Sequence, residues 1–311
     1  MHYSRTDGLR RFEATRHNRM IILRMVIRTA IINASIAFGG ESPQSSRESG
    51  PIVEIPTSRW SGDTGVNFVT AYFAFGILQE NKGAIAEPYL DISRTLFEGN
   101  GFITKATVGL QLWSSIHSEQ TGAKRNNPLL QWYEFDYYVP IGVTIAKRLT
   151  LTVSYLEYEF PNGAFAAQRG VQANVAFDDT DVLGPFALHP HVLILYNFEG
   201  ILGIGQSDAW YAELGVAPSF SIASKSNYPV TVTFPLTFGL GDNHFYPGDT
   251  YGYFSATANV SVPLAFIPKS FGPWTVNAGF TYYNLGEATA TINAHGDHNA
   301  YVGQLGMGLT F

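Results

Sequence analysis

The C-terminal segment Tyr301-Val-Gly-Gln-Leu-Gly-Met-Gly-Leu-Thr-Phe311 alternates between two kinds of residue. Its large apolar side chains, at 301, 305, 307, 309 and 311, fall on one face of an extended strand. Small or polar residues fall on the other face. Such alternation with a period of two is typical of a transmembrane β-strand with lipid on one side and a wet lumen on the other. This segment alone leaves open an edge strand of a soluble β-sandwich.

The same alternation recurs along the chain from Val66 onward. Phe254, Ala256, Ala258, Val260 and Val262 share one face of a segment, and Tyr253, Ser255, Thr257, Asn259 and Ser261 share the other. Tyr133, Phe135, Tyr137, Val139 and Ile141 likewise share an apolar face, opposite Glu134, Asp136 and Tyr138. We expect twelve strands, at 66–75, 84–97, 102–113, 132–145, 149–158, 170–177, 188–198, 210–220, 230–240, 251–262, 274–283 and 301–311.

The polar face of these strands carries mostly Thr, Ser, Asn, Gly and Tyr, whereas a soluble sandwich would carry Lys, Glu and Arg there. The C-terminal strand is ~33 Å long and projects to ~25 Å at a tilt of ~40°, the height of an apolar membrane band. The sequence therefore predicts an all-β, antiparallel, up-and-down transmembrane β-barrel, most simply of twelve strands. Long connections at 178–187, 221–229 and 263–273 keep ten or fourteen strands open, and Pro235 predicts a bulge within its strand.

Composition supports this interpretation. Charged residues make up 14% of the 311 residues, below the ~25% of a typical soluble domain, and there is no cysteine. The chain's net charge of −6 becomes −11 beyond residue 28, because seven arginines and only two acids precede that point. Nucleic acid is therefore not an expected partner.

The N-terminus is typical of an export signal. A basic stretch is followed by an apolar segment from about Met20 to Ala37, with Ser35-Ile36-Ala37 as small residues for cleavage. We expect a signal peptide over 1–37, starting at Met1, Met20 or Met25, a flexible periplasmic segment over 38–61 and the barrel over 62–311. An amphipathic N-terminal helix is the alternative.

The face opposite the apolar one supplies candidate pore-lining residues. They are Glu87, Tyr89, Asp91, Lys105, Gln111, Glu134, Asp136, Gln172, Asn174 and Glu213. Twelve strands leave a lumen of at most ~12–14 Å after side chains are subtracted from a backbone diameter of ~24 Å. Five acids against one base favour cations. The alternative is that these acids pair with Arg169 or Lys105 and only hold the barrel's shape.

Two segments resemble known outer-membrane proteins. Gln304, Gly306, Leu309 and Phe311 are similar to the C-terminal signal that the barrel-assembly machinery reads. Tyr72-Phe-Ala-Phe-Gly-Ile-Leu-Gln79 with Ala86-Glu-Pro-Tyr-Leu-Asp91, and Tyr158-Glu-Phe-Pro-Asn162, resemble the TorF-like porins, although Phe75 stands where that group usually has arginine. The resemblance implies an outer-membrane barrel in a Gram-negative-type envelope, with outer-membrane lipid, the assembly machinery and periplasmic chaperones as partners.

We therefore expect a porin-like channel for passive diffusion of small polar solutes, with no enzymatic activity and no cofactor. A lipid-hydrolysing barrel and a plugged structural or adhesive barrel are the alternatives. No Gly-x-Ser-x-Gly motif occurs. His189 and His191 are expected on one strand face as polar lumen residues, and His295-Gly-Asp-His298 as a solvated loop. Both are preferred to metal sites.

Overall fold

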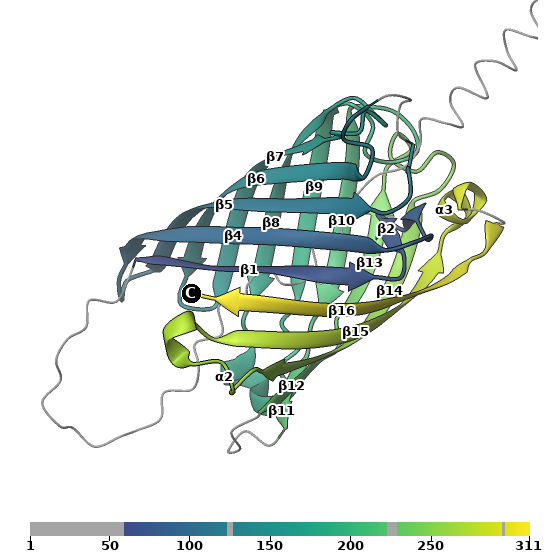
Figure 1. Cartoon of the computed structure of the whole chain (residues 1–311). Helices are drawn as coiled ribbons and strands as arrows, with labels where there is room; N and C mark the ends of the chain where they lie inside the picture. The colour runs from purple at the N-terminus through teal and green to yellow at the C-terminus, as the bar shows by residue number, and fades with distance from the viewer. Residues whose placement is uncertain (1–58, 123–126, 223–228, 294–295) are drawn as a thin grey trace, which may run out of the picture.

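The computed structural model describes residues 59–122, 127–222, 229–293 and 296–311, which form an antiparallel β-barrel (Figure 1). Neighbouring strands of the wall pair with one another, and β1 pairs with β16 to close the sheet. The predicted closed barrel of twelve wall strands is confirmed. The wall consists of β1 (Trp60–Val69), β4 (Ile85–Glu98), β5 (Ile103–His117), β6 (Trp132–Ile145), β7 (Leu149–Glu159), β8 (Gln168–Phe177), β9 (His191–Glu199), β10 (Ala209–Val216) with β11 (Ser219–Ile222), β12 (Val230–Thr233) with β13 (Leu236–Gly241), β14 (Tyr251–Pro263), β15 (Trp274–Leu285) and β16 (Asn299–Thr310).

Two wall strands are interrupted by prolines, which cannot donate to the ladder because they lack an N–H. Pro218 separates β10 from β11, and Pro235 separates β12 from β13. The two interruptions lie side by side, because the N–H of Phe234 donates to the carbonyl of Pro218 at 2.9 Å. The irregularity expected at Pro235 is present, and Pro218 adds a second one on the neighbouring strand.

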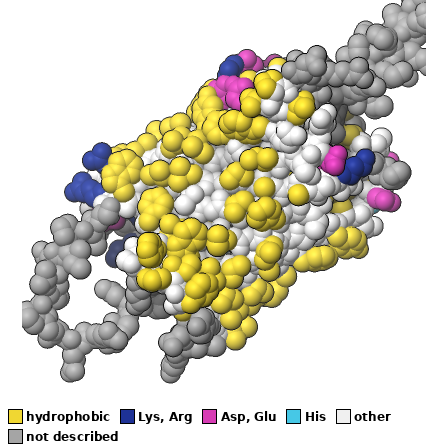
Figure 2. Space-filling model, in the orientation of Figure 1, with side chains coloured by type: hydrophobic (Ala, Val, Ile, Leu, Met, Phe, Trp, Pro, Cys, Tyr) yellow, Lys and Arg dark blue, Asp and Glu magenta, His cyan; other side chains and the backbone are white. Residues whose placement is uncertain are grey.

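The outward face of the wall is apolar, as the alternation predicts. Large hydrophobic side chains stand exposed there, among them Phe68, Ile141, Trp210, Phe280 and Leu305, each more than half exposed. Figure 2 shows hydrophobic side chains spread over the visible face of the barrel between its two ends. An exposed apolar surface of this extent is expected of a wall in contact with lipid.

The two ends of the barrel differ. The loop end carries the connections 70–84, 118–131, 160–167, 200–208, 242–250 and 286–298. The last of these includes α3 (Glu287–Ile292). The terminus end carries Trp60, Phe311 and the connections 99–102, 146–148, 178–190 and 264–273, with α2 (Thr180–Leu183), η1 (Gly184–Phe186) and η2 (Lys269–Phe271).

The first connection departs from the prediction. The first wall strand ends at Val69, and Tyr72–Ala74 form β2, which pairs with β3 (Ile77–Glu80) in a hairpin of its own. The expected strand over 66–75 is therefore wrong in its second half. We call residues 70–84 the plug hairpin, because its aromatic residues are buried inside the loop end of the barrel.

A second departure concerns Tyr133, which was expected on the apolar outward face. The pairing of β5 with β6 shifts between Ser115 and Ile116, which places an extra residue in β6 at this point. Such a bulge turns a side chain to the other face. Tyr133 is 2% exposed and packs on the plug hairpin residue Tyr72.

The predictions for residues 1–58 lie outside the described residues, and the expected barrel start at 62 lies two residues after the start of β1. No helix in the described part of the chain has the length and hydropathy that a bilayer span requires.

Candidate channel interior

The plug hairpin seals the loop half of the barrel through aromatic contacts. Tyr72 and Ile77 are fully buried, and Phe73 is 4% exposed. The ring of Phe73 stacks on Tyr283 of β15 at 5.1 Å, and that of Tyr72 lies 5.3 Å from Trp113 of β5. The hairpin therefore contacts two separate parts of the wall, β15 and β5, and fills the space between them.

Hydrogen bonds fix the plug hairpin to β6. The hydroxyl of Tyr72 donates to Oε2 of Glu134 at 3.1 Å. The hydroxyl of Tyr133 donates to Oε1 of Gln79 at 2.6 Å. Both contacts are buried, where such bonds are stronger and costlier to lose than at a surface.

Two other loop-end connections hold the tip of the hairpin. The side chain of Asn293, which follows α3, accepts from the N–H of Leu78 at 2.8 Å and donates to the carbonyl of Gly76 at 3.3 Å. The hydroxyl of Tyr246, in the connection 242–250, donates to the carbonyl of Phe75 at 2.8 Å. Three separate connections thus meet over the lumen.

The turn at the tip is strained. Phe75 has a φ of 47° and Gly76 a φ of 73°, a left-handed pair that suits glycine and disfavours phenylalanine. The ring of Phe75 packs 4.4 Å from that of Tyr211 and 5.0 Å from that of Phe245. These buried contacts offset the backbone cost, so the unusual residue at this position is explained by the plug.

A polar relay joins the hairpin to β5. Nε2 of His117 lies 2.7 Å from the hydroxyl of Ser115, Nδ1 lies 2.7 Å from that of Thr121, and Thr121 donates to Glu80 at 2.6 Å. Because the Glu80 carboxylate can only accept, Thr121 must accept from His117 Nδ1–H. Nε2 then accepts from Ser115. Sequence reasoning missed this relay, since Glu80 ends β3, a strand that was not expected, and Thr121 lies in a connection.

The predicted acidic residues face the interior at two levels. Glu134 and Asp136 of β6 are fully buried, and Glu87 of β4 is 4% exposed, all in the loop half. Glu213 of β10 accepts hydrogen bonds from Tyr211 and Tyr253. Asp91 lies nearer the terminus end than Glu87, and its carboxylate accepts a hydrogen bond from the side chain of Gln111 at 2.6 Å.

Asp63 of β1 is an inward acid that the prediction omitted. It stands opposite Asp91 in the β1–β4 register. The expected first strand began at Val66, so this residue lay within the expected barrel range but before any expected strand. Gly62 and Thr64 hold the outward positions beside Asp63, and neither is a large apolar residue. The hydropathy pattern therefore does not mark this part of the strand.

The predicted bases do not neutralise these acids. Arg169 forms ion pairs with Glu157 at 2.6 Å and Glu199 at 2.7 Å, neither of which is among the predicted lumen residues. Pairing of the inward acids with Arg169 is therefore wrong. Lys105 lies near the start of β5, opposite Thr144, and is exposed at the terminus end.

The remaining candidates line the wall towards the terminus end. The hydroxyl of Tyr89 lies close to the wall over Gly65 and Gly308. A Cβ atom at either glycine would come within 2.7 Å and 2.6 Å of this hydroxyl, so the two glycines leave room for it. Gln172 and Asn174 of β8 pair with inward positions of β7 and β9. Whether these residues line a conducting path stays a prediction.

The predicted assembly-signal residues belong to the closing strand. Gln304 donates to the side chains of Asn67 and Asn277 on the two neighbouring strands. Gly306 leaves room for these two side chains, since a Cβ there would lie 2.1 Å from Oδ1 of Asn67. Leu309 pairs across β1, and the Phe311 N–H donates to the Gly62 carbonyl at 2.8 Å.

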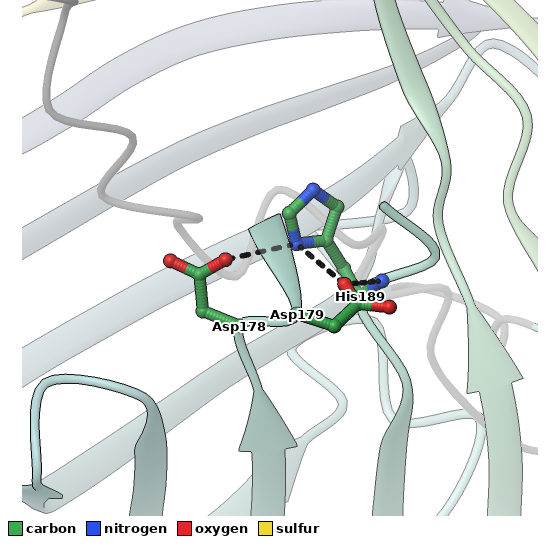
Figure 3. A group of neighbouring side chains, drawn as sticks. All are labelled: Asp178, Asp179 and His189. Carbon is green, nitrogen blue, oxygen red and sulfur yellow. Dashed lines mark hydrogen bonds and ion pairs between the residues drawn. The ribbon is translucent and has the colours of Figure 1, made fainter. Parts of the chain in front are cut away.

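One group of side chains in the described residues has the composition of a metal site, Asp178, Asp179 and His189 at the terminus end (Figure 3). Nδ1 of His189 lies 3.8 Å from a carboxylate oxygen of each aspartate. The Asp179 carboxylate also accepts the N–H groups of Leu188 and His189 at 2.9–3.1 Å. Burial opposes ionisation of Asp179, but these N–H donors and the nearby His189 hold its pKa below the usual value. The group therefore has a structural role, pinning the 178–190 connection.

His189 and His191 were expected on one strand face, and this prediction is wrong. His189 has a φ of 49° and precedes β9, whereas His191 begins that strand and lies over Gly215 of β10. In the last loop, His295 lies outside the described residues. His298 lies 3.6 Å from Glu287 and 2.9 Å from the Leu285 carbonyl.

A closed barrel with an apolar outward wall and a polar interior defines a transmembrane β-barrel protein. No family model and no curated protein matches the chain. Solved structures that resemble it are the NanC porin, at 8% identity and a TM-score of 0.43 over 80% of this chain and 100% of that chain. The chain also resembles the outer-membrane channel DcaP of Acinetobacter baumannii, at 9% identity and a TM-score of 0.33 over 81% of this chain and 96% of that chain. A loop-deletion mutant of OmpT, an outer-membrane protein of Vibrio cholerae, resembles it at 7% identity and a TM-score of 0.33, over 81% of this chain and 98% of that chain.

Proposed function

We propose that the protein is an outer-membrane channel for small polar solutes that prefers cations, and that the plug hairpin closes its loop end. The main support is the charge of the inward face. Asp63, Glu87, Asp91, Glu134, Asp136 and Glu213 face inward, and Lys105 is the one inward-facing Lys or Arg on the described wall strands. Carboxylates along a confined path raise the local cation concentration.

Partial exposure of the inward wall near the terminus end also supports a path. Asp91, Gln111, Thr257 and Gln304 keep intermediate exposure, whereas the inward residues of the loop half are buried. Water therefore reaches the interior from the terminus end as far as the plug hairpin. Passage through the barrel requires this hairpin to move.

Reversal potentials in planar bilayers test cation preference. Under a tenfold KCl gradient the wild-type protein is expected to give a potential of the cation-selective sign. Asp63→Asn/Asp91→Asn should shift this potential towards zero, because the interior loses two carboxylates. Glu119→Gln/Asp297→Asn removes the same charge from exposed loop positions and serves as the control. Anion preference in the wild type would refute the proposal.

A plugged structural barrel is the second candidate, because the hairpin is as well buried as a domain core. In that case no variant that leaves the plug in place would conduct. Removal of the plug would then open a hole that serves no solute in the native protein. Uptake of small amino acids and sugars by vesicles carrying the wild-type protein distinguishes the two, since only a native channel admits them.

A hydrolase is the third candidate, because the relay Ser115–His117–Thr121–Glu80 has the order of groups that activates a serine. Both Ser115 and His117 are fully buried, so a substrate has no access to the serine. Labelling by a fluorophosphonate that is lost in Ser115→Ala would support this activity. We expect no labelling, and the relay then serves to hold the plug.

A further inference from the structure

We infer that the terminus end carries a basic rim that binds the headgroups of anionic phospholipids. The basic rim comprises Arg59, Trp60, Arg94, Phe97, Phe102 and Lys147, at the ends of adjacent strands β1, β4 and β5 and in the β6–β7 turn. This inference rests on the proposed membrane location. It goes beyond it by naming the lipid class in contact with one end of the barrel.

Strand register makes the rim continuous. Trp60 is opposite Arg94 across β1 and β4, and the Thr95 N–H donates to the Arg59 carbonyl at 2.8 Å. The Ala146 N–H donates to the Phe102 carbonyl at 2.8 Å, which brings the β6–β7 turn against the β4–β5 turn. Basic side chains far apart in the sequence thus share one arc of the barrel edge, and Figure 2 shows Lys and Arg gathered there.

The charge of the rim is largely uncompensated. Arg59, Arg94 and Lys147 are exposed and take part in none of the ion pairs found among the described residues, and Glu98 is the one acid of these strand ends. The neighbouring Arg148 differs, because Asp181 pairs with it at 3.0 Å. The loop end is acidic by contrast and carries Glu119, Glu159, Glu199, Asp208, Asp242, Asp249, Glu287 and Asp297.

Aromatic side chains complete the rim. Phe102 is 75% exposed and Trp60 52% exposed, and the Arg94 guanidinium lies 5.5 Å from the Trp60 ring centroid. Trp at the edge of an apolar band places its ring at the level of lipid headgroups, and nearby arginine then reaches the phosphates. The rim continues the lipid-facing wall, so its occupant is the bilayer surface.

The β6–β7 turn adds an independent observation. Ala146 and Lys147 both have positive φ, 50° and 62°, in a two-residue turn closed by the Arg148 N–H and the Ile145 carbonyl. Asparagine and glycine suit such a turn better. The chain keeps a long, exposed basic side chain at this strained position, where a membrane phosphate can meet it.

Electron spin resonance of lipids labelled in the acyl chain tests the inference on the full chain reconstituted in phosphatidylcholine vesicles. Labelled phosphatidylglycerol should associate with the protein several-fold more than labelled phosphatidylcholine at low salt. In ~1 M salt the preference should disappear, because the Debye length falls to ~3 Å. Association of labelled phosphatidylcholine reports membrane insertion by itself, so loss of the preference alone leaves the proposed channel untouched.

The variant Arg59→Gln/Arg94→Gln/Lys147→Gln should reduce the preference for phosphatidylglycerol towards onefold. Asn81→Asp/Lys82→Gln/Gln120→Glu changes the net charge equally at exposed loop-end positions and should leave it intact. Lys147→Gln alone, at an exposed turn, should give a smaller loss if the triple variant fails to fold. Equal association of both lipids with the wild-type protein, or an unchanged preference in the folded triple variant, would overturn the inference.

Discussion

The hydroxyl of Tyr72 donates a hydrogen bond of 3.1 Å to Glu134, 62 residues further along the chain. This contact links the plug hairpin to the inward face of β6 and lies among fully buried rings. It couples an inward acid of the proposed cation path to the element that blocks that path. Closure and charge selectivity therefore depend on the same side chains.

Replacing Tyr72 by Phe should weaken closure of the loop end. The ring contacts with Trp113 and Tyr133 remain, whereas the hydrogen bond to Glu134 is lost, at a cost of about 1.5 kcal/mol. The fraction of time spent open should rise roughly tenfold in single-channel records. Tyr301→Phe, at an exposed outward-facing tyrosine, is the control. Identical open probabilities for Tyr72→Phe and wild type would show that the bond does not hold the plug.

Asn293 should act as a latch from a different connection. Asn293→Ala removes both hydrogen bonds to the backbone of the hairpin tip, at Leu78 and Gly76, and leaves these buried groups unpaired. We expect more frequent opening and faster proteolysis within residues 70–84. Thr291→Ala removes a hydrogen bond internal to α3 and should change neither quantity. Unchanged protection of the hairpin in Asn293→Ala would contradict the latch.

Gly306→Ala should destabilise the barrel independently of any assembly factor. The new Cβ would meet Oδ1 of Asn67 at 2.1 Å and Asn277 at 2.8 Å, and such overpacking costs about 1–3 kcal/mol. The measurement is urea unfolding of protein refolded in detergent micelles. Gly101→Ala is the control, because the nearest atom to its Cβ is 4.0 Å away. If Gly306 mattered only as a recognition signal, both variants would be as stable as wild type.

The 178–190 connection should confer a stability that depends on pH. Hydrogen bonds to the Asp179 carboxylate hold its folded-state pKa below the usual value of 3.8. The stabilisation is therefore complete above that value and is lost as the pH falls through the lower folded-state pKa. Asp179→Asn should reduce the free energy of unfolding at pH 7, and the difference from wild type should shrink at acidic pH. A constant difference between pH 7 and pH 3 would contradict this origin.

The wall could be predicted from alternation because lipid and a wet interior select opposite side chains on successive residues. Phe254 and Ser255 or Val276 and Asn277 show the rule, and their strands lie where it placed them. The number of strands also followed from the pattern. The proline interruptions changed the ladder locally and left the count intact.

The plug could not be predicted, since an aromatic strand pattern is the same whether its rings meet lipid or one another. Tyr72 continues the apolar face of Val66 and Phe68, and only the tertiary contacts with Trp113 and Tyr283 show that Tyr72 and Phe73 fold inward. Tyr133 was misplaced because a bulge has no clear signature in hydropathy. Asp63 was missed because small neighbours hide the strand around it.

The central claim is that the barrel is a channel closed by residues 70–84. Its most direct test is the single-channel conductance of the wild-type protein and of a variant with residues 71–83 replaced by a short Gly-Ser linker. The account predicts rare, small, cation-selective openings for the wild type and a larger, steady cation-selective conductance for the variant. Absence of any opening in the wild-type protein, or of conductance from the folded, inserted variant, would contradict it.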